Sequence, residues 1–105
     1  LILGVTFKEN CPDIRNSKVV DVHNELKDFG LEVDVYDYEA DPEDVKREHR
    51  IHLIDEITEK YEGILLAVSH TKFSMINIES IKKDSKSVIY DLKGFLPRNQ
   101  VNSRL

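Results

Sequence analysis

The chain has 105 residues, a formal charge of −5, 40% apolar residues and one cysteine. This length allows one domain at most, the single cysteine excludes a disulfide framework or a multi-cysteine zinc site, and the acidic balance argues against a general partner of nucleic acid or of anionic membranes. No apolar run approaches the ~20 residues of a transmembrane helix and no signal peptide is visible, so a soluble, reduced, cytoplasmic setting is expected.

The chain opens on an apolar segment. Leu1–Val5 is a nearly continuous apolar run, as expected of a strand that is covered on both faces. The polar residues 6–16 predict a long loop. Because the first residue is not Met and stands inside a hydrophobic strand, we expect the sequence to be a piece of a longer protein.

A helix and a second strand are predicted after this loop. Asn16 or Ser17 is expected to cap the helix and Gly30 to end it. One apolar face of this helix is formed by Val19, Val22, Leu26 and Phe29. Residues 31–35 alternate between apolar and acidic side chains, which predicts a strand that ends at Asp37.

The second half of the chain continues the alternation. Asp41 is expected to cap a helix that has Pro42 at its first position and fades near Arg50. Beyond it we predict a short strand at Ile51–Leu53, a short helix at Asp55–Tyr61, a strongly buried strand at Ile64–Val68, a brief helix at Asn77–Lys83 and a last strand at Val88–Tyr90.

Strands that alternate with helices predict an α/β fold. Three strands are apolar on both faces, which favours a Rossmann-like three-layer sandwich with a mostly parallel sheet, built by residues 1–105 as a single domain. Right-handed crossovers place the C-terminal ends of the strands at one edge, where ligands of such sheets bind. Candidate site residues therefore lie at positions 6–15, at Asp37, and at positions 69–72 and 91–98.

The loop after the first strand is cationic where a dinucleotide-binding domain would carry a GxGxxG turn. That stretch has one glycine, so the tight cradle for a pyrophosphate is missing, and Lys8 and Arg15 precede a helix N-terminus instead. Two cations beside free backbone N–H groups could bind a phosphate or a diphosphate. The alternative is that both are solvated charges, paired with Glu9 and Asp13.

Two more residues at this edge could contact an anionic ligand. Phe7 is either a core residue that closes the sheet or a flat surface for a base. Lys93 follows the last strand, with Gly94 behind it to let the backbone turn. A cation at this position would lie at the same edge as Lys8 and could share its ligand.

The remaining reactive side chains predict no catalytic or metal site. Cys11 has no neighbouring base and is expected to be a neutral loop thiol. His49 and His52 lack further metal ligands. His70, just past the buried strand, is expected to have a hydrogen-bonded structural role. The acidic run from position 37 carries Pro42 where a calcium loop requires glycine, so a calcium site is rejected.

The opening of the chain resembles a known family. Residues 4–17, Gly-Val-Thr-Phe-Lys-Glu-Asn-Cys-Pro-Asp-Ile-Arg-Asn-Ser, are similar to the start of the C-terminal domain of the UDP-glucose/GDP-mannose dehydrogenase family, with its G-x-x-F-K stretch followed by D-x-R. Residues 35–37, 64–68 and 91–94 fall where that family places later strands. The form of these motifs looks closest to the branch that acts on UDP-N-acetylhexosamines.

The resemblance implies an NAD-dependent enzyme of which this chain is a part. Family members oxidise the C6 hydroxyl of a nucleotide-sugar to a carboxylate with NAD, for surface polysaccharides in this branch. They carry an N-terminal NAD-binding domain, a helical middle segment with the catalytic cysteine, and this C-terminal domain. The chain alone is therefore expected to be inactive and to hold no catalytic residue, and the full-length protein is expected to be a homo-oligomer.

Site residues are carried over position by position. The resemblance implies that Phe7 and Lys8 contact the UDP-sugar and that Arg15 reaches the NAD bound mainly by the N-terminal domain. Lys93 stands where the family often has a substrate-contacting arginine, and lysine lacks the bidentate fork of arginine. Cys11 does not match the catalytic cysteine.

Two other classes compete with this interpretation. A receiver-like signalling domain is also a small parallel α/β fold with a lysine after its last strand, but it needs an acidic pair after the first strand, where this chain has Thr6, Phe7 and Lys8. A non-catalytic interaction domain would share the fold without a nucleotide site. Titration with UDP would separate these alternatives.

Overall fold

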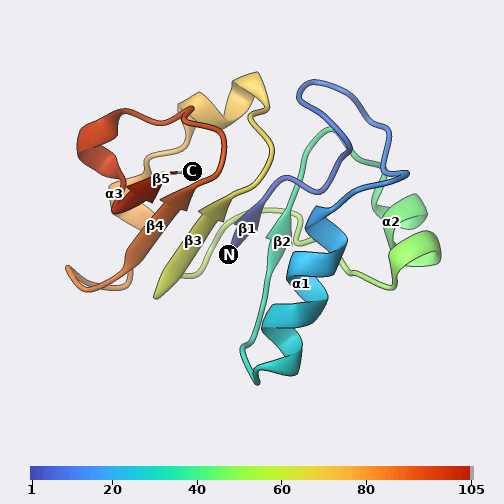
Figure 1. Cartoon of the computed structure of the whole chain (residues 1–105), viewed down its shortest axis with the longest axis horizontal. Helices are drawn as coiled ribbons and strands as arrows, with labels where there is room; N and C mark the ends of the chain where they lie inside the picture. Colours follow the sequence, from blue (N-terminus) through green and yellow to red (C-terminus); the bar gives the residue numbers. More distant parts are fainter. Residues whose placement is uncertain (105) are drawn as a thin grey trace.

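The computed structural model, which describes residues 1–104, is built around a parallel sheet of five strands in the order β2-β1-β3-β4-β5 (Figure 1). The strands are β1 (Ile2–Leu3), β2 (Val35–Tyr36), β3 (Gly63–Leu66), β4 (Val88–Asp91) and β5 (Ser103–Arg104). Every pairing between neighbours is parallel. The predicted Rossmann-like α/β fold is thus confirmed.

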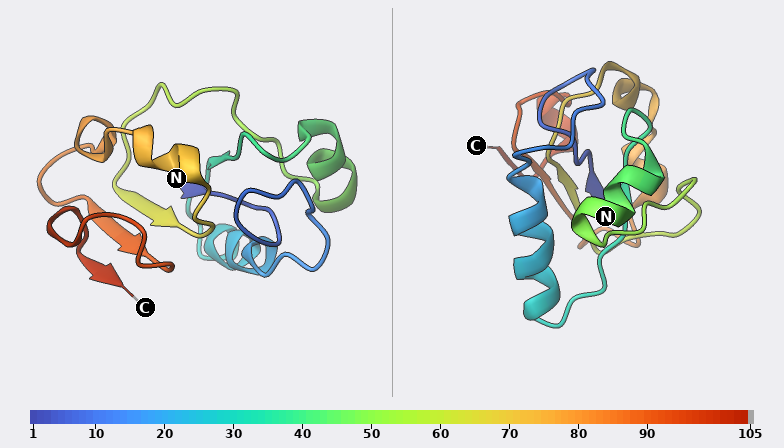
Figure 2. Two further views of the ribbon diagram at one scale, coloured as in Figure 1. Left: turned by 90° about the horizontal axis from the view of Figure 1, so that it is seen from above. Right: turned by 90° about the vertical axis from the view of Figure 1, so that its right-hand side faces the viewer.

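Helices cover both faces of this sheet and connect its strands. They are α1 (Val19–Asp28), α2 (Pro42–His49) and α3 (Ile78–Ile81), with short 3₁₀ helices η1 (Thr71–Met75) and η2 (Arg98–Gln100). Seen from above, η1 and α3 lie on one side of the strands and α1 on the other (Figure 2). None of the helices in residues 1–104 is long and apolar enough to cross a membrane.

The core consists of two clusters of apolar side chains, one on each face. Successive strand residues alternate between them, as the pleat requires: Leu3 packs with Phe73, Ile78 and Ile89, whereas Ile2 packs on the opposite face. The second cluster also contains Val5, Ile14, Val35, Ala40, Val45, Ile51 and Ala67. β1 is therefore buried on both faces, which explains its unbroken apolar sequence, whereas β3 and β4 are buried on one face and are half-buried or exposed on the other, at Leu65, Tyr90 and Val88.

The N-terminus of α1 differs from the prediction. Lys18 occupies the cap position without a side-chain hydrogen bond, Asn16 adopts a φ of +58° in the turn before it, and the buried Ser17 hydroxyl has no hydrogen-bond partner among residues 1–104. The predicted apolar face is also shifted. His23 is buried, whereas Phe29, which forms the C-terminal cap, is 80% exposed.

Other boundaries changed because strand pairing decides them. β2 is no longer than its ladder with β1, which pairs Ile2 with Val35 and Leu3 with Tyr36, so the strand predicted from Leu31 to Asp37 is confirmed only at Val35–Tyr36. The predicted helix at 55–61 is also wrong: Tyr61 donates its backbone N–H to Ile81 and forms an isolated bridge. Of the predicted strand at 51–53, Leu53 alone makes a bridge, to Val35. β5 was not predicted.

The strand order places a topological switch point between β1 and β3. The chain moves from β1 outward to β2, and after returning to β3 it proceeds in the opposite direction to β4 and β5. In open α/β sheets, ligands bind at the carboxyl ends of strands where the order reverses. The loops that follow β1 and β3 therefore frame the expected ligand position.

Gly4 makes the close approach of these two loops possible. Its φ is +97°, and a Cβ atom built on it would stand 2.6 Å from Val68 Cβ and 3.0 Å from the Val68 backbone nitrogen. A side chain at this position would force the ends of β1 and β3 apart. The glycine of the G-x-x-F-K stretch therefore serves backbone packing at the switch point.

Candidate functional site

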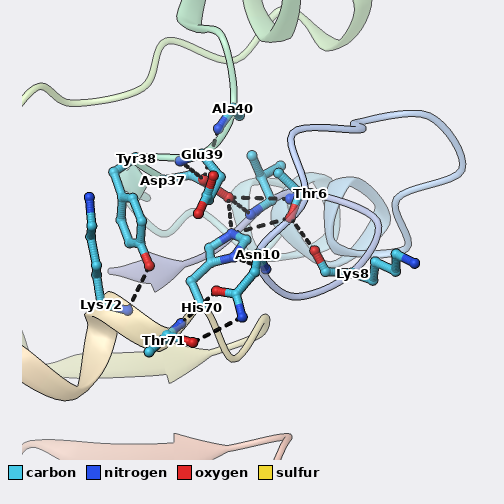
Figure 3. A network of polar contacts seen from close by, with 11 residues as sticks. Thr6, Lys8, Asn10, Asp37, Tyr38, Glu39, Ala40, His70, Thr71 and Lys72 are labelled. Carbon is cyan, nitrogen blue, oxygen red and sulfur yellow. Dashed lines mark hydrogen bonds and ion pairs between the residues drawn. The ribbon is translucent and has the colours of Figure 1, made fainter.

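A buried polar network occupies the switch point. Asp37 follows β2, Thr6 follows β1 and His70 follows β3, and their side chains meet below the loops (Figure 3). His70 Nε2 lies 3.0 Å from Asp37 Oδ2 and 3.2 Å from Thr6 Oγ1. All three residues are almost completely buried. Buried polar groups of this kind must be paired to be tolerated, and here they are.

The partners of His70 define its tautomer. The backbone N–H of Asn10 donates to His70 Nδ1 over 2.9 Å, so Nδ1 is the unprotonated acceptor. Nε2 then carries the proton and shares it between Asp37 and Thr6. The Thr6 hydroxyl is free to donate to the carbonyl oxygen of Lys8, at 2.9 Å. The imidazole is therefore neutral, and every polar atom of the network has a partner.

Asp37 is the anionic centre of the network. Its Oδ2 accepts from the N–H groups of Val5 and Thr6, at 2.7 and 3.3 Å, and its Oδ1 accepts from those of Glu39 and Ala40, at 2.8 and 3.1 Å. Burial acts to raise the pKa of the Asp37 carboxyl, but the hydrogen bonds from His70 and the backbone outweigh it, so the pKa lies below its ordinary value. Asp37 stays ionised and holds the β1 and β2 loops together.

Asn10 ties the β1–α1 loop to the β3–η1 loop. Its side-chain oxygen accepts from the backbone N–H of Thr71 at 2.8 Å, and its amide donates to Thr71 Oγ1 at 2.9 Å. The residue adopts a φ of +57°, a left-handed conformation that asparagine tolerates better than most residues. Together with the bond to His70, this clasp fixes one end of the segment that carries Phe7 and Lys8.

The structure places Phe7 and Lys8 on the surface of this loop. Phe7 is 56% exposed and is therefore not the core residue that one alternative predicted. Lys8 is also exposed, makes no ion pair with any residue in 1–104, and its side chain points away from the buried network (Figure 3). The predicted pairing of Lys8 with Glu9 is not observed.

Arg15, in contrast, does pair within the loop. Its Nη2 lies 3.0 Å from Asp13 Oδ2 and its Nε donates to Asp13 Oδ1, a bidentate contact in an exposed setting. The hydrogen bond from Arg15 lowers the pKa of Asp13 to about 2. The Asp13 carbonyl also accepts from the N–H of Phe7 at 2.6 Å, so the pair closes the loop on itself. The guanidinium remains 82% exposed and open to further contacts.

A second buried carboxylate shapes the loop that presents Lys93. Asp91, at the end of β4, accepts from the N–H of Lys93 at 2.9 Å through Oδ1 and from that of Leu96 at 2.7 Å through Oδ2. Gly94 has a φ of +65°. Lys93 is thereby exposed on the loop after β4, which lies at the same edge of the sheet as the loop after β1, with the end of β3 between them (Figure 1).

The other candidates from the sequence take no part in the buried network. Cys11 is half-buried in the β1–α1 loop, and His49 contacts the Ile14 carbonyl oxygen at 3.0 Å. In the described part of the chain no three His, Cys, Asp or Glu side chains are grouped to hold a metal ion.

Exposed cations and one exposed aromatic ring thus lie on the loops after β1 and β4, at the C-terminal edge of the sheet. Lysine ammonium groups can bind phosphate oxygens, and an aromatic face can stack on a base. Asp37 and His70, the titratable side chains of the network, are buried and already paired with each other. This edge is therefore suited to binding an anionic ligand, on a Rossmann-like α/β domain.

The comparison with protein families assigns this domain. Residues 1–98 match the model of the UDP-glucose/GDP-mannose dehydrogenase family, UDP binding domain. The chain belongs to this family. The family expected from the G-x-x-F-K and D-x-R pattern is thus confirmed, which decides against the receiver-like alternative.

Curated relatives share the whole chain but are much longer. This chain is 46% identical to UDP-N-acetyl-D-glucosamine 6-dehydrogenase of Salmonella typhi and 43% identical to the protein of that name in Pseudomonas aeruginosa, over 100% of the chain in both cases. Protein CapL of Staphylococcus aureus is 39% identical over 96% of it. The chain spans about a quarter of the length of these relatives, namely 25%, 26% and 24%.

A solved structure has the same fold. The UDP-N-acetyl-mannosamine dehydrogenase Cap5O from S. aureus aligns with a TM-score of 0.72 over 98% of this chain and 24% of its own, at 20% sequence identity. The likeness confirms the α/β architecture.

Proposed function

We propose that this chain is the UDP-sugar-binding domain of an NAD-dependent nucleotide-sugar 6-dehydrogenase. The observation that carries the proposal is the family match over residues 1–98, together with exposed cations on the loops after β1 and β4, at the carboxyl edge of the sheet. The full-length protein would oxidise the C6 hydroxyl of a UDP-hexose or UDP-N-acetylhexosamine to a uronate, for surface polysaccharide synthesis. The names of the relatives with 46% and 43% identity support the N-acetylhexosamine branch.

Lys8, Phe7 and Lys93 would each contact a different part of the ligand or approach it from a different loop. Lys8 would bind the diphosphate, because its ammonium is exposed and makes no ion pair within residues 1–104. Phe7 would pack against the base or the sugar, and Lys93 would contact the ligand from the neighbouring loop. Binding energy gathered on the nucleotide, remote from C6, can then orient the sugar for oxidation.

NAD and the reacting groups would come from outside this chain. Residues 4–18 separate β1 from α1, so the tight glycine turn that holds a pyrophosphate in dinucleotide domains is replaced by a long loop. Arg15 would reach the NAD held mainly by an N-terminal domain, and the hydride would pass to its nicotinamide ring. The 105-residue chain would then be an inactive C-terminal piece of a cytoplasmic homo-oligomer, with no nucleic-acid or membrane partner.

The proposal is tested by NADH formation with a panel of UDP-sugars. The full-length enzyme should reduce NAD with at least one UDP-hexose or UDP-N-acetylhexosamine, and the 105-residue chain should form no NADH with any of them. NADH formation by the chain alone would contradict the assigned division of roles. A folded full-length enzyme that reduces NAD with none of these substrates would overturn the proposed function.

A further inference from the structure

The segment that carries Lys8 is held on both sides by one imidazole. After Lys8 in the sequence, the Asn10 N–H donates directly to His70 Nδ1 at 2.9 Å. Before Lys8, the Thr6 hydroxyl accepts from His70 Nε2 at 3.2 Å and donates to the Lys8 carbonyl at 2.9 Å. The two nitrogens of His70 therefore fix the backbone before and after the exposed lysine (Figure 3).

The imidazole itself cannot move easily. Its ring is fully buried, with the rings of Tyr38 and Phe73 at centroid distances of 5.4 and 5.2 Å. Asp37 Oδ2 accepts a hydrogen bond from the Nε2–H group over 3.0 Å, and the carboxylate is itself held by four backbone N–H groups. The orientation of the ring is thus set by the core of the domain, and the loop takes its position from the ring.

Lys8 needs such support because nothing in residues 1–104 pairs with its ammonium group. A long exposed side chain reaches a phosphate in a defined geometry only if its backbone is already placed, and ordering the loop at the moment of binding would cost affinity. The cost is avoided if the loop is held in its binding position beforehand.

We propose that His70 is a positioning residue for ligand binding: its Nδ1, as the acceptor for Asn10, holds the segment 7–10 in the conformation that presents Phe7 and Lys8. This role rests on the proposed UDP-sugar site, and His70 itself touches no ligand. Asp37 acts through His70 by fixing the tautomer that leaves Nδ1 free to accept.

Two substitutions separate the roles of the two ring nitrogens. His70→Asn keeps an acceptor near Nδ1 and loses the donor to Asp37, whereas His70→Gln keeps a donor near Nε2 and loses the acceptor for Asn10. Ile78→Ala, on α3 in the core cluster that contains Phe73, the ring packed against His70, is the matched control for a loss of stability alone. For each variant, affinity for UDP is measured by calorimetry and unfolding by urea, at a temperature where the chain is folded.

The proposal predicts that His70→Gln weakens UDP binding by about three- to tenfold, the loss expected for one hydrogen bond between neutral groups. Ile78→Ala should bind UDP within about twofold of the wild type, and His70→Asn, which keeps the acceptor for Asn10, should lose less affinity than His70→Gln, although each variant lowers stability. Amide signals of residues 7–10 should shift in ligand-free His70→Gln and stay in place in Ile78→Ala.

Equal affinity of the wild type and His70→Gln would overturn the positioning role and leave the proposed site intact. Affinity that falls in step with stability across all three variants would show that His70 is merely structural. A wild-type chain that binds no UDP would overturn the proposed site and the positioning role together.

Discussion

Replacing Asp37 with asparagine should destabilise the domain more than any other single-atom change at this edge. Each carboxylate oxygen serves at least two donors: Glu39 and Ala40 bind Oδ1, and Val5, Thr6 and His70 bind Oδ2. An amide has only one oxygen, so its NH₂ group must face at least two N–H donors in either orientation.

The size of the loss follows from those contacts. A hydrogen bond to a charged group contributes about 1.5–3 kcal/mol, and two are lost, whereas relief from burying a charge returns part of that energy. We therefore expect Asp37→Asn to lower the free energy of unfolding by about 3–5 kcal/mol, against a total of about 5–15 kcal/mol for a domain of this size.

Urea unfolding at several pH values tests this prediction. The pKa of Asp37 is lowered on folding from 3.8, so its stabilising effect is fully present above that pH and is lost as the pH falls through the folded pKa. The gap between wild type and variant should therefore shrink below about pH 4. Asp34→Asn is the control, because Asp34 accepts one side-chain hydrogen bond, from Tyr61 at 2.7 Å. A gap below 1 kcal/mol at pH 7, or equal losses in both variants, would refute the reasoning.

Four further substitutions, one of them a control, have defined outcomes. Gly4→Ala should lower the free energy of unfolding by about 2–4 kcal/mol because of the positive φ and the clash with Val68. Gly63→Ala is the control, because the space around Gly63 is open, and it should change the free energy of unfolding by less than about 1 kcal/mol. Both variants are measured by urea unfolding, and equal losses of stability would contradict the prediction. Lys8→Ala in the full-length enzyme should reduce kcat/KM by about 10- to 150-fold with unchanged stability, and an unaltered kcat/KM would show that Lys8 is only a solvated charge. Cys11→Ser should keep most of the enzyme's activity, since loss of oxidation with intact nucleotide binding would make Cys11 the catalytic thiol.

The sequence predicted the architecture well because buried strands are marked by runs of apolar residues. Ile64–Val68 and Val88–Tyr90 are apolar in the way that central parallel strands must be, and the cap of α2 was visible in Asp41 and Pro42. The predicted helix at 55–61 does not form, because Ile57 and Tyr61 pack against the core cluster from an irregular segment. The hydrogen bond from the Tyr61 N–H to the Ile81 carbonyl joins residues that are distant in the sequence.

Only part of the candidate site could be predicted from the sequence. Lys8 and Lys93 could be placed at the edge of the sheet, because strand ends and topology decide that position. The network below them could not be predicted, because Thr6, Asp37 and His70 are far apart in the chain and meet only once the strand order is known. The polar side chains that directly follow three predicted strands were the available signal.

Titration of the ¹⁵N-labelled chain with UDP tests the central claim most directly. Amide signals of residues 7–17 and 93–95 should shift together along one binding curve, because the loops after β1 and β4 lie at the same edge of the sheet. Binding is expected to be weak for a domain that supplies only part of a cleft. Shifts confined to Gly30, Gly63 and Val88 at the opposite edge would contradict the placement of the site, and the absence of any shift at millimolar UDP would contradict nucleotide binding by this domain.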